Sequence, residues 1–169
     1  ESAAELERFY QRHGAYLALL YGLNSTDFHL ENIIAVGEHP MLIDLETLFN
    51  SLADVFDVTV ADVAAQKAMS ESVMQVGMLP MRIWSGEEYE GIDISGLGGT
   101  PGQLSPDRIP EPADAGTDAM HFVRRRFELP GDANRPSLNG EEASAVDHMD
   151  SIVAGFDRMY RLLMAHKRE

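Results

Sequence analysis

Two short apolar runs, separated by a turn, constrain the fold of this chain most strongly. Apolar side chains fill positions 33–36 and 41–43, and the four residues between them, 37–40, include Gly and Pro. This pattern predicts a β-hairpin. A hairpin returns the chain to the end at which its first strand began, so the residues before position 33 and after position 43 are expected to lie side by side.

Polar side chains flank this hairpin on both sides. Asp27, His29 and Asn32 precede the first strand, and Asp44 and Glu46 follow the second. Convergence of these groups gives the carboxylate and amide oxygens that Mg²⁺ prefers, together with a carboxylate near an attacking hydroxyl. The sequence therefore predicts a magnesium-dependent phosphoryl-transfer site. Because Asp44 follows an apolar run directly, we also expect its carboxylate to be paired or metal-bound.

Composition narrows the class of protein. The 169 residues suit one domain, and a hydrophobic content of 44% supplies a core. Lys and Arg number 13 against 28 Asp and Glu, and 13 − 28 gives a formal charge of −15. Such a charge disfavours nucleic acid or an anionic membrane as partner and favours a metal cation or a basic peptide. The absence of cysteine excludes disulfides and Cys-ligated zinc within these residues.

Targeting signals are missing. No apolar run approaches the roughly 20 residues of a membrane span, and the first residues lack the pattern of a signal peptide. We therefore expect no membrane span and a cytoplasmic location. The chain begins without Met and runs directly into a helical pattern, which suggests a segment of a longer polypeptide.

Periodicity predicts helices joined by short hairpins. A capping box, Ser2-x-x-Glu5, starts the first helix. Helices are expected at about 3–22, 60–77 and 144–166, and strands at about 81–84, 89–97 and 121–129. Positions 97–116 and 130–141 are expected to be irregular. The third helix should bury Ile152, Val153, Phe156, Met159, Tyr160, Leu163 and Met164. The order of elements predicts an α+β fold with no parallel sheet.

The motif Asp27-x-His29-x-x-Asn32 followed by Asp44-x-Glu46 resembles the catalytic and metal loops of the dehydratase domain of class II lanthipeptide synthetases, the LanM type. Further blocks that resemble this family occur at 38–49, 93–99, 116–120 and 134–140. The resemblance implies that 1–169 is a single segment of such a domain, with a fold similar to the C-terminal lobe of lipid and protein kinases. The catalytic and metal loops then occupy 24–50, and a long irregular activation-type segment occupies 85–141.

The resemblance also implies a reaction. Such enzymes phosphorylate Ser and Thr of a ribosomal precursor (leader–core) peptide with ATP and Mg²⁺, then eliminate the phosphate to leave an alkene. The implied partners are this peptide and the remainder of the synthetase, namely a kinase-type N-terminal lobe and a zinc-dependent cyclase domain. Because the chain carries neither the lobe nor the cyclase, we expect it to be inactive in isolation.

Carried over by position, the resemblance assigns roles to the polar residues of the two loops. Asp27 would orient or deprotonate the substrate hydroxyl, and His29 would support the loop or the phosphates. Asn32 and Asp44 would ligate magnesium, and Glu46 would take a second metal or base position.

Thr117 matches a family threonine that the elimination step uses. From the residues alone, an N-cap or turn role for Thr117 is equally compatible. The chain departs from the family pattern at Glu111, where some members carry an elimination arginine.

Arg124, Arg125 and Arg126 form the one concentrated basic patch. On a strand, Arg124 and Arg126 share a face that suits phosphate, but surface ion pairs are the favoured interpretation. Two other functions stay open. The loops suit a metal-dependent phosphoesterase, which needs no ATP-binding lobe. Alternatively, the chain is a catalytically silent peptide-binding module.

Overall fold

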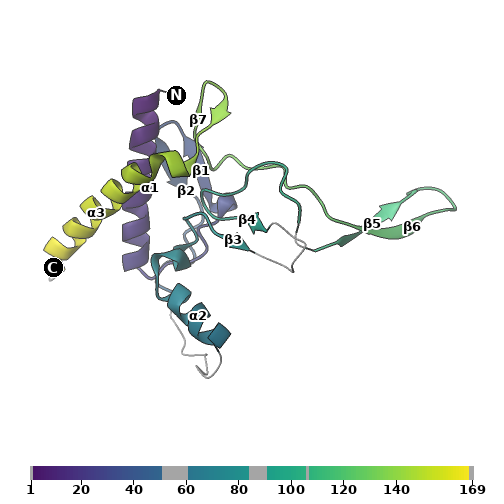
Figure 1. Ribbon diagram of the computed structural model, residues 1–169, viewed down its shortest axis with the longest axis horizontal. Helices are drawn as coiled ribbons and strands as arrows, with labels where there is room; N and C mark the ends of the chain where they lie inside the picture. The colour runs from purple at the N-terminus through teal and green to yellow at the C-terminus, as the bar shows by residue number, and fades with distance from the viewer. Residues whose placement is uncertain (1, 51–60, 84–90, 106, 168–169) are drawn as a thin grey trace.

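The computed structural model describes residues 2–50, 61–83, 91–105 and 107–167. Its helices are α1 (Ala3–Gly22), α2 (Ala61–Ser70) and α3 (Met149–Ala165), with the 3-10 helices η1 (Leu30–Asn32), η2 (Val73–Val76) and η3 (Ala145–His148). The strands form antiparallel pairs: β1 (Ile33–Val36) with β2 (His39–Leu42), β3 (Arg82–Ile83) with β4 (Ile92–Asp93), β5 (Ile109–Ala113) with β6 (His121–Arg125), and β7 (Ser137–Leu138) with β8 (Glu141–Glu142). Figure 1 shows this mixture of helices and small sheets, which confirms the α+β class.

Helix α1 begins at the predicted capping box. The hydroxyl of Ser2 accepts a hydrogen bond from the Glu5 backbone N–H at 3.3 Å, and the Glu5 carboxylate accepts one from the Ser2 backbone N–H at 2.7 Å. Reciprocal bonds of this kind satisfy N–H groups that a helix start leaves unpaired. The buried residues of α1 are Leu6, Phe9, Tyr10, His13, Gly14, Leu17, Ala18 and Leu20. The predicted helix over 3–22 is confirmed.

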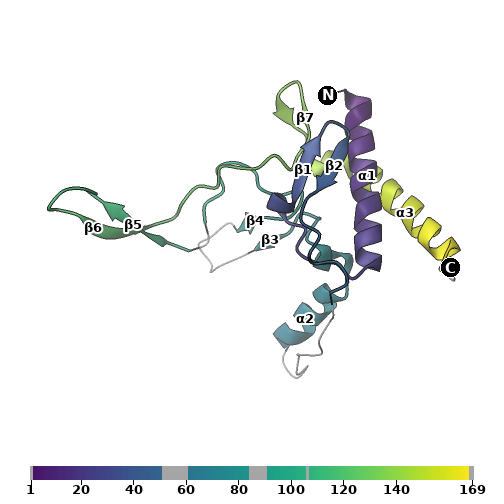
Figure 2. The same cartoon turned by 180° about the vertical axis from the view of Figure 1, so that it is seen from behind.

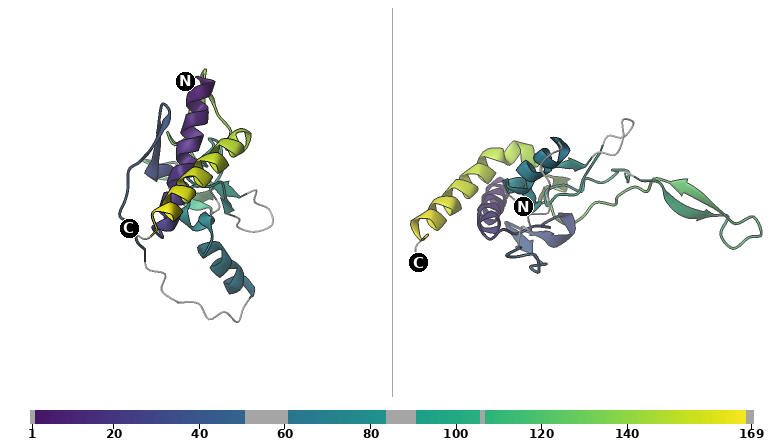
Figure 3. Two further views of the ribbon diagram at one scale, coloured as in Figure 1. Left: turned by 90° about the vertical axis from the view of Figure 1, so that its left-hand side faces the viewer. Right: turned by 90° about the horizontal axis from the view of Figure 1, so that it is seen from below.

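Helix α3 crosses α1 at very close range, as Figure 3 shows. A Cβ atom at Gly14 would overlap the carbonyl oxygen of Ile152, and one at Gly155 would overlap that of Gln11. Glycine at both positions therefore permits backbone-to-backbone contact, which a side chain on either helix would prevent.

The core lies between α1, the β1–β2 hairpin and the turns after α2. One buried cluster consists of Leu17, Leu20, Phe28, Ile33, Val76 and Met78, and a second of Phe9, Tyr10, Leu97 and Ile152. Phe28 is completely buried although it belongs to the predicted catalytic loop. That loop is therefore fixed to the core by its own side chain.

The β1–β2 hairpin lies beside α1, as Figure 2 shows. Val36 pairs with His39, so the turn consists of Gly37 and Glu38. The predicted turn at 37–40 is wrong in length, because His39 and Pro40 belong to β2. Gly37 has φ 55°, a backbone conformation that favours glycine in tight hairpin turns.

The turn of this hairpin is attached to α1 by Glu38. A nitrogen of the Arg12 side chain lies 2.7 Å from the Glu38 carboxylate, and another donates to the Glu38 carbonyl oxygen at 2.6 Å. Arg8 also binds this carboxylate. The hydrogen bonds from Arg12 and Arg8 lower the pKa of Glu38. This end of the hairpin is therefore held to α1, and the polar loops lie at the other end.

Two further predictions differ from the structure. The helix expected over 60–77 is wrong as a single element, because α2 ends at Ser70 and η2 starts again after Ser72; residue 60 lies outside the described residues. In η2, Ser72 accepts a hydrogen bond from the Met74 backbone N–H, so it is a new N-cap. The activation-type segment over 85–141 is not irregular throughout, since β4 to β7 lie within it.

Helix α3 carries more exposed apolar surface than predicted. Ile152 is buried, but Val153, Tyr160 and Met164 are 59%, 47% and 49% exposed. The predicted inner face is therefore wrong for these three residues, because α3 contacts α1 around Gly155 and its C-terminal half extends away from the body (Figure 3). Within the described residues, no helix combines the length and apolar character needed to cross a lipid bilayer.

Candidate functional site

The loop before β1 is fixed by backbone hydrogen bonds to distant segments. The Phe28 N–H donates to the Val76 carbonyl oxygen at 2.9 Å, and the Leu30 N–H donates to that of Ile94 at 3.0 Å. Directly before Phe28, Asp27 has φ 67°, in the left-handed region that Asp and Asn tolerate better than most residues. A non-glycine residue held in this conformation is a feature that recurs at functional sites.

The loop after β2 lies beside the first loop. The Ile43 N–H donates to the Asn32 carbonyl oxygen at 3.1 Å, and the Thr47 hydroxyl donates to the Thr26 carbonyl oxygen at 2.5 Å. These bonds join residues on both sides of Asp44 to residues on both sides of Asp27. The proximity of the two loops, predicted from the hairpin, is therefore present.

Asp27, His29 and Asn32 form one hydrogen-bonded group. The Asn32 amide nitrogen donates to the Asp27 carbonyl oxygen at 2.9 Å, which orients the amide. His29 Nδ1 accepts from the Glu31 backbone N–H at 3.3 Å, so a neutral ring carries its proton on Nε2. That nitrogen lies 3.6 Å from the Asp27 carboxylate. The same nitrogen lies 3.5 Å from the Asn32 amide nitrogen, so the His29 ring is close to both the Asp27 carboxylate and the Asn32 amide.

Asp44 and Glu46 are exposed acids of the second loop. The Asp44 carboxylate accepts a hydrogen bond from the Glu46 backbone N–H at 3.2 Å. We expected a paired or metal-bound Asp44 carboxylate because the apolar run before it implied a desolvation cost. Ile43 before it is 47% exposed, so the carboxylate incurs little desolvation cost. Within the described ranges, no three His, Asp or Glu side chains form a group that could hold a metal ion.

The donor atoms present nevertheless fit a hard cation. The Asn32 amide donates through its nitrogen, which leaves its oxygen available as a ligand. Asp44 and Glu46 add carboxylate oxygens from the neighbouring loop. Mg²⁺ is commonly bound by one or two carboxylates, while water and substrate phosphates complete its octahedral shell. Two acids and one amide are enough for such a site.

The sequence did not predict the contacts that hold the two loops together. Asn24 has φ 54°, and its side-chain nitrogen donates to the Asn50 carbonyl oxygen. The Asn24 side-chain oxygen accepts from Gln75 at 3.2 Å, and the Asn50 side chain donates to the Thr26 hydroxyl at 3.2 Å. The sequence offers one signal here: Asn24 follows Gly22 by two residues, a pattern that indicates the end of a helix but not these contacts.

Thr117 is not part of this group. It lies in the connection between β5 and β6, at the tip of a ribbon that projects away from β1 and β2 (Figure 1). Its hydroxyl donates to the Asp114 carbonyl oxygen at 2.8 Å and accepts from the Ala119 backbone N–H at 3.2 Å. In this structure Thr117 therefore has the contacts of a turn residue.

The arginine patch lies on the same ribbon. Arg124 and Arg125 belong to β6, whereas Arg126 follows it. Among the residues that the structure describes, neither Arg124 nor Arg125 forms an ion pair. The favoured interpretation, surface ion pairs with neighbouring carboxylates, is therefore wrong for these two residues.

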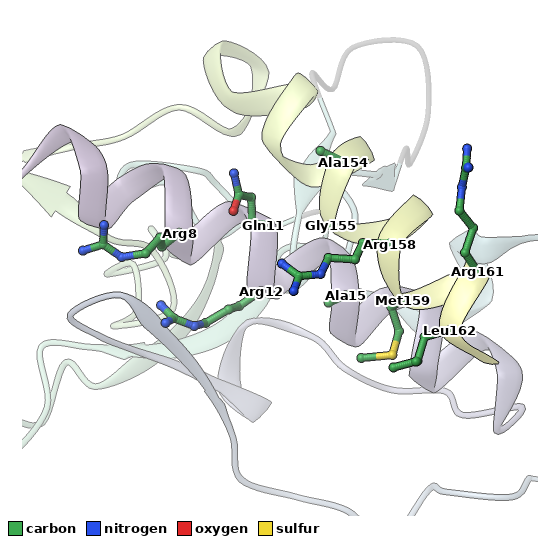
Figure 4. Close-up of a pocket in the computed structure, with 10 residues that line it drawn as sticks. All are labelled: Arg8, Gln11, Arg12, Ala15, Ala154, Gly155, Arg158, Met159, Arg161 and Leu162. Atoms are coloured by element: carbon green, nitrogen blue, oxygen red, sulfur yellow. The ribbon is translucent and has the colours of Figure 1, made fainter. Parts of the chain in front are cut away.

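Two concave surfaces flank α3, and neither contains the predicted site residues. A cleft of about 900 Å³ between α1 and α3 is lined by Arg8, Gln11, Arg12, Ala15, Ala154, Gly155, Arg158, Met159, Arg161 and Leu162, drawn in Figure 4. An apolar groove of about 730 Å³ includes Leu17, Val73, Met149, Val153, Phe156 and Tyr160. Arg8 and Arg12 are already bound to Glu38. The two loops therefore remain the better candidate for chemistry.

Comparison with known proteins identifies the family. The whole chain, residues 1–169, matches the family described as a domain of unknown function, DUF4135, and it belongs to that family. It is also 33% identical over 175 residues to the lacticin 481/lactococcin biosynthesis protein LcnDR2 of Lactococcus lactis subsp. lactis. The aligned region is 99% of this chain and 18% of that relative, so the chain spans less than a fifth of its length. The resemblance to LanM-type lanthipeptide synthetases is confirmed by these matches.

Proposed function

We propose that this chain is the magnesium-binding part of an enzyme that dehydrates Ser and Thr residues of a precursor peptide in lanthipeptide biosynthesis. The enzyme uses ATP to phosphorylate the side-chain hydroxyl and then eliminates the phosphate. The observation that carries the proposal is the attachment of the Asp44 loop to the Asp27 loop, through Ile43 to Asn32 and Thr47 to Thr26. Membership of a family with a relative named for lacticin biosynthesis supports it.

In the phosphorylation step, the substrate hydroxyl attacks the γ-phosphorus of ATP, and ADP leaves. Asp27 orients this hydroxyl and accepts its proton, while His29 holds the carboxylate of Asp27 in place. Asn32, Asp44 and Glu46 would hold Mg²⁺, which neutralises charge on the phosphates when bound. These residue roles fit the kinase-like C-terminal lobe expected from the resemblance, because phosphoryl transfer depends chiefly on positioning the reactants and neutralising the charge of the phosphates.

In the elimination step, a base removes the α-proton of the phosphorylated residue, the carbon–carbon double bond forms, and phosphate leaves with the bonding electrons. Thr117 is proposed to take part in this step. The ribbon that carries Thr117 would then have to meet the phosphopeptide outside the two loops, because Thr117 lies at its tip. We propose that the chain acts only within the longer synthetase. Kinases use a lysine to hold the phosphates of ATP. Neither of the two lysines of this chain, Lys67 and Lys167, belongs to the two loops.

Conservative substitution of either acid tests the phosphorylation step. Asp44→Asn removes a metal-binding charge, and Asp27→Asn removes the proton acceptor but keeps a residue that tolerates φ 67°. In the full-length synthetase, each should lower the rate of phosphorylation at least about a hundredfold. Mass spectrometry of the precursor peptide after incubation with ATP and Mg²⁺ measures this rate.

A matched acid elsewhere provides the control. Asp132 is exposed and lies outside both loops, so Asp132→Asn should leave the rate within about twofold of wild type. Normal phosphorylation by Asp44→Asn would refute the proposal. Hydrolysis of a simple phosphoester by the chain without ATP, lost in Asp44→Asn, would instead favour the phosphoesterase.

Substitution of Thr117 separates the two chemical steps. If Thr117 takes part in elimination, Thr117→Ala leaves phosphorylation intact, and the phosphorylated peptide accumulates in place of the dehydrated one. Thr117→Ser, which keeps the hydroxyl, should restore elimination. Complete dehydration of the peptide by the Thr117→Ala enzyme would show that Thr117 takes no part in elimination and serves only in the turn.

A further inference from the structure

The ribbon formed by β5 and β6 is open along its edges. In the part of the chain that the structure describes, these strands pair with each other and with no third strand. The ribbon projects from the body in both views (Figures 1 and 2), and Phe122 is 69% exposed. Isolated two-stranded ribbons are marginally stable in water, and an unpaired strand edge is a template for another strand. The two edges of this ribbon are chemically different.

Two prolines determine which backbone groups of the ribbon pair internally. Pro110 lies opposite Arg124, and Pro112 lies opposite Phe122. Because proline has no N–H, these cannot be the pairs that exchange two hydrogen bonds across an antiparallel ladder. The exchanging pairs are therefore the intervening ones, Ile109 with Arg125, Glu111 with Val123 and Ala113 with His121.

The remaining backbone groups point outward from the two edges. The edge of β5 presents the carbonyl groups of Pro110 and Pro112 but no donor at these positions, and prolines are known to block strand addition. The edge of β6 presents both an N–H and a carbonyl group at Phe122 and at Arg124. This spacing of two residues matches the outward groups of any extended chain. Only the β6 edge is therefore equipped to accept a strand.

Side chains on one face of the ribbon add a chemical preference. Phe122 and Arg124 lie on the same face, with Pro110 and Pro112 opposite them. No carboxylate occupies this face of the ladder, since Glu111 belongs to the other set of positions. An added strand would place two of its side chains, two positions apart, beside Phe122 and Arg124. An apolar residue suits the first position, and a carboxylate suits the second.

We propose that the free edge of β6 binds an extended segment of the precursor peptide by strand addition, with an apolar side chain beside Phe122 and a carboxylate beside Arg124. This inference rests on the proposed function, because it takes a peptide to be the substrate. Charge complementarity supports this occupant: Arg124 is a cation without an ion pair among the described residues of a chain whose net charge is −15.

Binding measurements with matched variants test the role of the backbone. The probe is the fluorescently labelled precursor peptide encoded beside the gene of the full-length synthetase, measured by anisotropy without ATP. Phe122→Pro and Phe122→Ala both remove the ring, but only proline removes the outward N–H, and Pro112 shows that such a position accepts it. We expect Phe122→Pro to bind at least about threefold more weakly than Phe122→Ala. Equal affinities would overturn strand addition.

Charge reversal on the two faces tests the side-chain preference. Arg124→Glu should weaken binding about tenfold, whereas Arg125→Glu, on the opposite face, should bind within about twofold of wild type. Equal effects of the two substitutions, or none, would contradict the proposal.

Hydrogen–deuterium exchange shows which edge is covered, independently of any variant. Adding the same peptide to the full-length synthetase should slow exchange over residues 121–126 and leave 109–113 unchanged. Protection of 121–126 before the peptide is added would mean that another part of the synthetase covers this edge, which would overturn the proposal. The Asp44→Asn enzyme should show the same protection without dehydration. If the wild-type enzyme shows slower exchange over 121–126 but does not dehydrate the peptide, the proposed function alone is refuted. If it dehydrates the peptide without slower exchange over 121–126, the β6 proposal alone is refuted.

Discussion

At the scale of single residues, one histidine lies fully inside the protein. His13 of α1 is fully buried, and its Nε2 lies 3.3 Å from the Met78 carbonyl oxygen. Its Nδ1 is buried and has no hydrogen-bond partner among the described residues. Burial lowers the pKa of His13 to about 4, although the hydrogen bond to Met78 acts in the opposite direction. His13 is therefore neutral at pH 7 and donates through Nε2.

This buried histidine predicts how stability depends on pH. Between its ordinary value of 6.5 and about 4, the unfolded chain binds a proton that the folded chain does not. The free energy of unfolding therefore falls as pH falls through this window, by about 3 kcal/mol in total, and His13 causes no change above it. Urea unfolding at several pH values measures the effect. His13→Gln should reduce this dependence, whereas His121→Gln, at an exposed site, should not. An unchanged dependence in His13→Gln would contradict the assignment.

The sequence predicted the grouping of site residues better than their surroundings. Asp27, Asn32 and Asp44 belong to loops at one end of a hairpin, so local topology alone brought those loops together. The exposure of Asp44 was not predictable, because a four-residue strand does not reveal which face the rest of the molecule covers. In β2, Pro40 is buried while Met41 is 48% exposed. The position of Thr117 depends on the direction of a whole ribbon, which no short motif encodes.

At the scale of elements, the α1–α3 crossing depends on two glycines. Gly14→Ala or Gly155→Ala would bring a methyl group into the backbone of the other helix, and helix backbones cannot move apart without losing the contacts around Ile152. Each substitution should lower the free energy of unfolding by about 3 kcal/mol or more. Thermal unfolding followed by circular dichroism measures the loss.

Gly22→Ala is the matched control for this prediction. Gly22 is the last residue of α1, and a Cβ there would meet only the Leu163 side chain, at 3.8 Å. The control should therefore change stability by less than about 1 kcal/mol. If Gly14→Ala were equally mild, the close crossing of the two helices would be wrong.

Helices were predicted from the sequence more accurately than strands. Helix α1 begins at a capping box, so its start was evident from the sequence. Strand β5 was assigned to an irregular segment because Pro110 and Pro112 occur within five residues. Prolines are compatible with an edge strand only when their positions face away from the partner, and pairing of that kind is a tertiary property.

At the scale of the whole molecule, much apolar surface remains open. The exposed apolar residues of η3 and α3 include Val146, Met149, Val153, Tyr160, Leu162 and Met164. Several of them line the apolar groove beside α1 and η2. Apolar surface of this extent usually marks contact with another protein surface. It is consistent with a chain that matches 18% of a longer relative.

The account depends on the sharing of one divalent cation by the two loops. A crystal structure of the full-length synthetase with Mn²⁺ and a non-hydrolysable ATP analogue, with anomalous data to locate the metal, tests this most directly. We predict a metal ion bonded to a carboxylate oxygen of Asp44 and to the side-chain oxygen of Asn32, with Asp27 beside it. A metal ion bound to the nucleotide but to neither Asn32 nor Asp44 would contradict the account.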